Sequence, residues 1–180
     1  MDDDTRHNEV KEPATKENFL QVYEDYSDAI FRFCLTKTRS RDIALDLTQD
    51  TFIKTWEYLA NGKTVDQIRP FLYRVARNLI IDLSRKKTTL SLDSYMEDGG
   101  DIKETNPDQF GIAFDVDQAL KLVGMLDAKY REPITLRHVE NLSLAEIAKV
   151  MGVSENVVSV RLHRGIKQLQ ELVAEKFPTV

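Results

Sequence analysis

Apolar residues recur at three- and four-residue steps along most of the chain, and this period is typical of amphipathic helices. One such stripe lies near the start of the chain and consists of Phe19, Tyr23, Tyr26, Ile30 and Phe33. Strand-like alternation of apolar and polar residues is missing, and no internal repeat is visible. The pattern therefore predicts an all-α fold.

Two more helices are expected in the same part of the chain. The segment "SRDIALDLTQDTFIKTWEYL" is expected to pack through Ile43, Leu47, Phe52 and Trp56. After the break "ANGKT" comes "IRPFLYRVARNLIIDLSRKK", in which the apolar residues lie within about 80° of one another at helical spacing. These apolar residues are Ile68, Leu72, Val75, Leu79 and Leu83. The residues on the other side of this helix are Arg69, Arg74, Arg77 and Arg85, with Tyr73 among them.

The segment "TTLSLDSYMEDGGDIKETNPDQFG" is expected to be a linker, because it holds paired glycines, an Asn-Pro and many acids but no helical or strand period. It predicts two small helical domains. Residues 1–13 form an acidic tail that is expected to be disordered, residues 14–87 a first domain, residues 88–113 a flexible acidic linker, and residues 114–177 a second domain.

The second domain contains the pattern of a helix-turn-helix. Ser143 and Glu146 have the spacing of a capping box, which marks a helix start. Gly152 ends this short helix where a tight turn needs positive φ. Small Ala148 allows close helix crossing, and Val158 can anchor the second helix. An ordinary pair of packed helices is the alternative.

The charges are unevenly distributed. The net charge is −5, yet the acids concentrate in the tail and the linker, while residues 69–87 hold six basic residues and one acidic residue. The second helix of the motif, within "VSENVVSVRLHRGIKQL", has no acid after Glu155. Such segregation suggests nucleic acid as a partner, although a solvated helix face would look similar. Gly165 is unfavourable inside a helix, and it indicates either close approach to DNA or an irregularity without function.

Other classes of protein fit the sequence poorly. The histidines His7, His138 and His163 are far apart, and no glycine-rich phosphate loop or nucleophile motif appears. The single cysteine, Cys34, excludes an internal disulfide and fits a reducing cytosol. No apolar stretch approaches the ~18 residues of a membrane span, and the acidic N-terminus is neither a signal peptide nor an anchor. We therefore expect a cytoplasmic protein with no catalysis, no cofactor, no metal and no membrane insertion.

Three motifs in order make the chain similar to a sigma factor of bacterial RNA polymerase, of the extracytoplasmic-function (ECF) group. They are "DLTQDTFIKTW", "FLYRVARNLIIDLSR" and "LSLAEIAKVMGVSENVVSVRLHR", and the resemblance covers nearly all of residues 19–172. It implies that the first domain is sigma region 2 and the second is sigma region 4. The implied partners are core RNA polymerase, through its β′ clamp helices and β flap, and a promoter with −10 and −35 elements. Many members are also held by an anti-sigma protein, and no residue reveals whether this chain is.

The resemblance assigns roles to three sets of residues. The candidates for core polymerase binding are Asp46, Gln49, Asp50, Lys54 and Trp56. The candidates for −10 recognition and melting are Lys63, Tyr73, Arg74, Arg77, Asn78, Arg85, Lys86 and Lys87. The candidates for −35 recognition are Ser159, Val160, Arg161, His163, Arg164 and Lys167.

Some of these assignments have alternatives. Trp56 could belong to the core, and Asn78 could cap or bridge helices. Relatives usually carry a Lys or Arg followed by Ser where this chain has Ser159 and Val160, so an uncommon −35 sequence is expected. Val160 could make only apolar contact, for instance with a thymine methyl.

Two other functions remain open at this point. A stand-alone helix-turn-helix regulator would bind its operator without polymerase. If the chain is a purely protein-binding helical module, charge reversal at Arg161 and Arg164 would change nothing about DNA.

Overall fold

The computed structural model describes residues 13–94 and 122–176 of the chain. Its helices are α1 (Phe19–Thr38), α2 (Arg41–Ala60), α3 (Ile68–Ser94), α5 (Ala128–His138), α6 (Leu144–Met151) and α7 (Glu155–Lys176). Within the described residues there is no strand, only an isolated bridge that pairs Ala14 with Val65. The prediction of an all-α fold is confirmed. Nearly all of the predicted tail and the linker beyond Ser94 lie outside the described residues.

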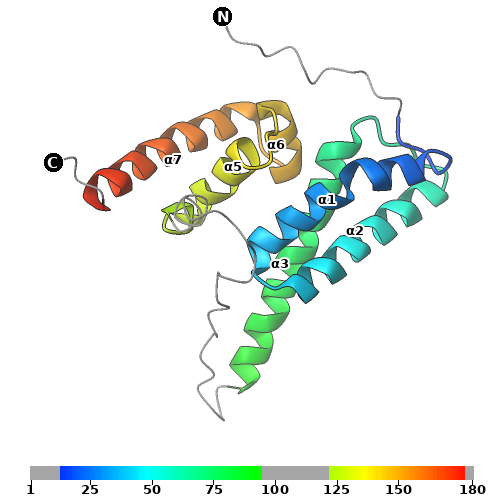
Figure 1. Ribbon diagram of the computed structural model, residues 1–180, viewed down its shortest axis with the longest axis horizontal. Coiled ribbons are helices and arrows are strands. Elements are labelled where there is room, and N and C mark those ends of the chain that lie inside the picture. The colour runs from blue at the N-terminus through cyan, green and yellow to red at the C-terminus, as the bar shows by residue number, and fades with distance from the viewer. Residues whose placement is uncertain (1–12, 95–121, 177–180) are drawn as a thin grey trace, which may run out of the picture.

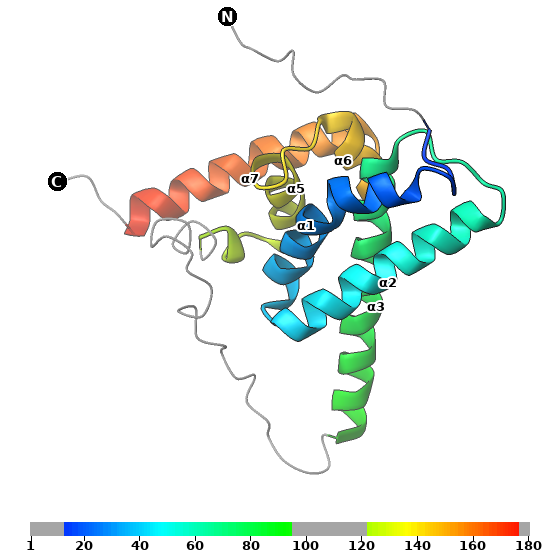
Figure 2. The ribbon, with the colours of Figure 1, turned by 45° about the vertical axis from the view of Figure 1, so that its right-hand side comes forward.

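The helices form two groups, as Figures 1 and 2 show from two directions. Helices α1, α2 and α3 pack against one another, and α5, α6 and α7 make the second group. The two groups touch, because α6 lies against the N-terminal part of α3. Helix α3 continues to Ser94, so residues 88–94 of the predicted linker have helical backbone.

The core of the first group combines apolar stripes from all three helices. Ile30 and Phe33 of α1 and Leu72 of α3 are fully buried, and the ring of Phe33 lies 5.1 Å from that of Tyr73. Helix α2 differs from the predicted pattern, because it buries Thr48, Thr51 and Thr55 beside its apolar residues. Each threonine hydroxyl donates a hydrogen bond to the carbonyl four residues earlier, at 2.6–2.8 Å. This local bond satisfies the hydroxyl group, so the polar side chain can be buried.

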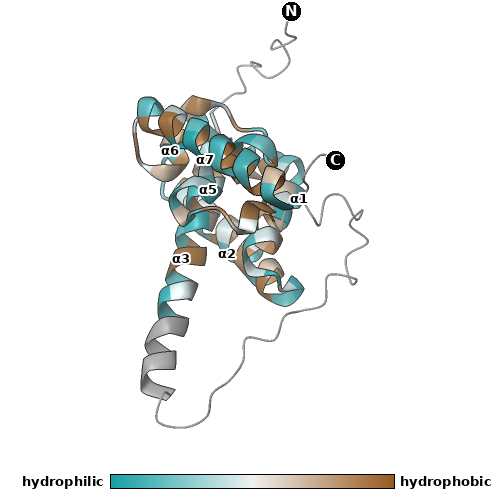
Figure 3. Cartoon of the chain, turned by 90° about the vertical axis from the view of Figure 1, so that its left-hand side faces the viewer, coloured by the Kyte–Doolittle hydropathy of each residue, from teal (hydrophilic) through white to brown (hydrophobic). Residues whose placement is uncertain are grey.

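Both predicted ends of α6, the first helix of the helix-turn-helix, are present. Ser143 Oγ accepts from the Glu146 amide and the Glu146 carboxylate accepts from the Ser143 amide, which completes the capping box. Gly152 ends α6 with φ 67°, the left-handed conformation that favours glycine. Figure 3 shows hydrophilic residues along the outer side of α7. Val158 and Leu162 are buried against the rest of this group.

The structure explains Gly165 in a different way from both interpretations offered by the sequence. It is buried where α7 crosses α5, and a Cβ atom there would lie 3.0 Å from both Ile134 Cγ1 and Tyr130 Cβ. The glycine therefore permits close packing of α7 on α5. Neither a DNA backbone nor a helix irregularity is needed to explain it.

Candidate nucleic-acid interface

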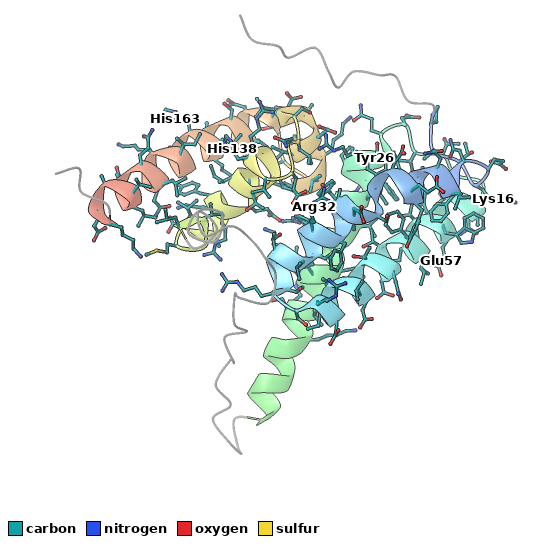
Figure 4. All side chains as sticks on the ribbon, viewed as in Figure 1. Lys16, Tyr26, Arg32, Glu57, His138 and His163 are labelled. Atoms are coloured by element: carbon teal, nitrogen blue, oxygen red, sulfur yellow. The ribbon has the colours of Figure 1, made fainter. Side chains whose placement is uncertain are left out.

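The outward face of α7 is cationic and open. The residues predicted to read the −35 element all lie on this helix, between Ser159 and Lys167. The exposed ones are Ser159, Val160, His163, Arg164 and Lys167, and Arg161 is half-buried. Figure 4 shows His163 on the side of α7 that faces away from the other helices. The arrangement follows from the burial of Val158 and Leu162, which turns the intervening positions outward.

A cleft beside this face contains one charged residue, Lys129, that sequence reasoning missed. The cleft has a volume of about 250 Å³ and lies between the starts of α5 and α7. Lys129 and Tyr130 of α5 line it together with Arg161 and Arg164 of α7. The Lys129 Nζ atom lies 4.8 Å from the centroid of the Tyr130 ring. The periodicity of apolar residues in the sequence gave no indication that residues 128–131 lie beside α7.

The candidate −10 residues, of which Lys63 precedes α3 and the others lie on it, divide into two sets. Lys63, Arg74, Asn78 and Lys86 are exposed. Arg74 lies 5.5 Å from the centroid of the Phe71 ring, and Arg85 is 4.0 Å from the Asp82 carboxylate. The side chain of Lys87 lies outside the described part of the chain. Tyr73 and Arg77 do not face solvent in the same way, because the second group of helices covers them.

Tyr73 is almost completely buried, with 1% of its surface exposed. Its hydroxyl donates a 2.8 Å hydrogen bond to Oε2 of Glu140, which follows α5 in the second group. Burial and the neighbouring Glu140 carboxylate raise the pKa of Tyr73, so the hydroxyl stays protonated and remains a donor. In this conformation Tyr73 is not available to bases.

Two arginines of α3 also bind carboxylates of the second group. Arg77 and Glu132 form a two-pronged ion pair with N–O distances of 2.8 and 3.1 Å. Arg69 donates to the backbone carbonyl of Glu140 and lies 3.6 Å from the Glu146 carboxylate. These two arginines are therefore turned toward the protein's own acids, whereas Arg74 and the α7 cations still face outward.

Glu140 is a buried carboxyl at the boundary of the two groups. It is 7% exposed, and among the described residues its Oε1 atom has no hydrogen-bond partner. Burial raises the pKa of Glu140 because it removes water from the charged form, and this outweighs the nearby positive charges. Those charges are Arg32 and Lys37 on α1 and Arg69 on α3. Figure 4 shows Arg32 on the side of α1 next to the second group.

A second open surface covers the outer side of α2. The predicted polymerase contacts Asp46, Gln49, Asp50 and Lys54 are all exposed. Trp56 is 40% exposed and its ring lies 5.2 Å from that of Phe19, so it contributes to both the core and the surface.

Leu45 and Ile53 extend this surface, with exposures of 40% and 53%, and sequence reasoning missed both. A usable signal was the run of threonines at the inward positions, which forces these apolar residues outward. Exposed apolar residues among charges are typical of a protein-binding surface.

Both helical groups match known protein families. Residues 22–89 match the family model described as sigma-70 region 2, and residues 117–169 match the one described as sigma-70, region 4. The ECF RNA polymerase sigma factor SigL of Mycobacterium tuberculosis strain H37Rv is 27% identical over 155 residues, which are 86% of this chain and 88% of that protein. SigM of Bacillus subtilis strain 168, also an ECF RNA polymerase sigma factor, is 27% identical over 84% of this chain and 93% of its own length.

A solved structure matches as well. It is the sigma factor RpoE of Bartonella quintana, crystallised with the anti-sigma factor NepR, with a TM-score of 0.71 and 26% identity. The match covers 91% of this chain and 99% of that one. The structure defines a helical protein with two open surfaces, a cationic one on α7 and one with charged and apolar residues on α2. The chain belongs to the sigma-70 family, in its extracytoplasmic-function group.

Proposed function

We propose that the chain binds core RNA polymerase through α2, directs it to a two-part promoter through α7 and α3, and helps to open the duplex. It would act in the cytoplasm, where polymerase works, and contribute no catalysis of its own. The observation that carries this proposal is the exposed cationic face of α7, presented by a correctly capped helix-turn-helix. No described helix has the length and apolar character needed to cross a bilayer.

The −35 element would be read by the start of α7. In a helix-turn-helix the second helix enters the major groove, where early residues meet base edges and basic residues meet phosphates. The exposure of His163 and Arg164 supports this role. Arg161 in the cleft adds positive charge beside the same face and would contact the DNA backbone, whereas Lys129 there lies 3.6 Å from the Asp127 carboxylate.

The −10 strand would be bound at the N-terminal part of α3. A cleft of about 270 Å³ lies there, and it is lined by Val65, Asp66, Gln67, Pro70, Phe71 and Arg74 and by Lys149 of α6. An aromatic ring beside a positive charge suits an unpaired base and its phosphate, as in other single-strand sites. Residues 14–87 and 114–177 are the proposed region 2 and region 4 units.

The β′ clamp helices would bind the outer side of α2. Acidic Asp46 and Asp50 lie on the same exposed side of α2 as the apolar residues Ile53 and Trp56, which suits a partner with both basic and apolar side chains. Region 4 would contact the β flap. Because RpoE was crystallised with an anti-sigma factor, a protein inhibitor of this chain is also a reasonable partner.

The test is in vitro transcription with core polymerase and a library of promoters. We expect promoter-specific transcripts from the full chain, and transcription no higher than that of core enzyme alone would favour a stand-alone regulator. Arg164→Glu should abolish initiation that depends on the −35 element while leaving polymerase binding intact.

A paired variant tests the other surface. Ile53→Asp places a charge in the exposed apolar part of α2 and should weaken polymerase binding without changing the fold, because Ile53 packs little against the core. Glu24→Lys, on an exposed site of α1, is the control for a surface charge change. Equal polymerase binding by both variants would refute the assignment of α2.

A further inference from the structure

A short segment before α1 is bonded to the loop that joins α2 to α3. The Ala14 amide donates a 2.9 Å hydrogen bond to the Val65 carbonyl, and the Val65 amide donates a 3.1 Å bond to the Ala14 carbonyl. Ala14 is 1% exposed and Val65 is 8% exposed, so both residues belong to the core. Figure 2 shows the segment beside this loop.

The side chain of Asn18 holds the backbone on both sides of Ala14. Its Oδ1 atom accepts a 2.7 Å hydrogen bond from the Thr15 amide, and its Nδ2 atom donates a 3.1 Å bond to the Pro13 carbonyl. Asn18 is also the N-cap residue of α1, yet its side chain makes no capping hydrogen bond. An N-cap asparagine usually accepts from an amide in the first turn of the helix. Its side chain therefore stabilises residues 13–18, which we call the strap.

The loop that the strap contacts supplies part of the cleft at the start of α3. The loop comprises residues 61–67, and the cleft is lined by its last three residues together with residues of α3. Of residues 61–67, Val65 is the buried one and the others are exposed. A loop with so few buried contacts opens easily. The two backbone bonds between Val65 and Ala14 therefore limit the movement of this side of the cleft.

We propose that the strap positions the cleft for the −10 strand, with Asn18 as a positioning residue. This inference rests on the proposed binding of the −10 strand at this cleft. Of the described residues, those that line the cleft do not include Asn18, so its effect on DNA passes through Ala14 and Val65. A loop already held in one conformation binds more tightly, because no further ordering is needed. Loss of the strap lowers the fraction of chains with a competent cleft, and the apparent affinity falls with that fraction.

The first experiment measures the loop itself by hydrogen exchange in the full chain. Asn18→Ser removes the amide group from the strap and supplies a hydroxyl that can cap α1. Gln21→Ser is the matched control, because Gln21 is exposed and its amide donates to Asp25 on the same helix. We expect the Val65 amide to exchange at least about fivefold faster in Asn18→Ser, since two hydrogen bonds of the strap are lost. Equal Val65 exchange in the two variants would overturn the proposal.

The second experiment measures binding of a fluorescent, random-sequence single-stranded DNA 12-mer to the full chain. Asn18→Ser should bind the 12-mer about three- to tenfold more weakly than the unsubstituted chain, whereas Gln21→Ser should bind it equally well. Polymerase binding should be the same in both variants, because the exposed side of α2 is not part of the strap. A similar loss of polymerase binding in Asn18→Ser would indicate a general structural effect and contradict the positioning role.

Arg74→Ala separates this inference from the proposed function. Arg74 lines the cleft from α3, outside the loop that the strap contacts. Unchanged 12-mer binding in Arg74→Ala would refute the role of the cleft in −10 binding, and the positioning role with it. Weaker binding in Arg74→Ala, together with equal binding by Asn18→Ser and Gln21→Ser, would refute the positioning role alone.

Discussion

Replacing Gly165 with alanine tests the packing of α7 on α5. The added Cβ would lie 3.0 Å from Ile134 Cγ1, 3.0 Å from Tyr130 Cβ and 3.3 Å from Ile134 Cδ1. Ordinary carbon–carbon contacts lie at about 3.5–4.0 Å. The two helices would therefore have to move apart by a few tenths of an ångström.

Two opposing effects decide the magnitude. Alanine favours a helix interior over glycine by about 1 kcal/mol. An extra methyl group in a well-packed contact costs about 1–3 kcal/mol. The packing cost should prevail, so we expect Gly165→Ala to lower the free energy of unfolding by about 1 kcal/mol.

The assay is urea unfolding of the full chain followed by circular dichroism. Gln170→Ala, at an exposed site on the same helix, is the control, and it should change stability by less than about 0.5 kcal/mol. In an Ile134→Ala background the cost of Gly165→Ala should shrink, because one of the two closest contacts is gone. If Gly165→Ala raised the free energy of unfolding by about 1 kcal/mol, helix propensity alone would explain the effect. That result would refute the close packing of α7 on α5.

Three further predictions concern single groups. Burial at the boundary of the two groups raises the pKa of Glu140, so the contact between the groups should favour its protonated form and loosen as pH rises above the ordinary value of 4.5. Transfer efficiency between fluorophores attached through Gln67→Cys and Lys149→Cys should then fall as pH rises, and a fall that persists unchanged in Glu140→Gln would argue against this group. Burial raises the pKa of Cys34 to about 11, so its thiol should react very slowly with a disulfide reagent at pH 8 and rapidly in urea; fast reaction in the native chain would contradict its burial. Ser143→Ala removes the cap of α6 and should cost about 1 kcal/mol in urea unfolding, and an unchanged midpoint would mean that the capping box does not stabilise the motif.

The sequence determined the features that depend on near neighbours along the chain. The capping box at Ser143, the left-handed turn at Gly152 and the inward position of Val158 all followed from spacing, because a helix end is governed by residues three or four apart. The same local rules gave the all-α fold and the outward cations of α7. The identity and order of the three motifs then indicated the sigma family.

Tertiary structure decided which residues lie opposite one another, because the spacing of residues along the chain does not predict contacts between helices. Leu45 and Ile53 are exposed because threonines of α2 satisfy their hydroxyls locally and take the inward positions. Gly165 is small because α5 crosses α7 there. Tyr73 was expected to meet DNA, yet it contacts Glu140, a residue 67 positions away in the chain. Pairing across such a distance depends on how the two domains pack. Interactions between near neighbours along the chain do not link Arg69, Tyr73 and Arg77 of α3 to the glutamates that they contact.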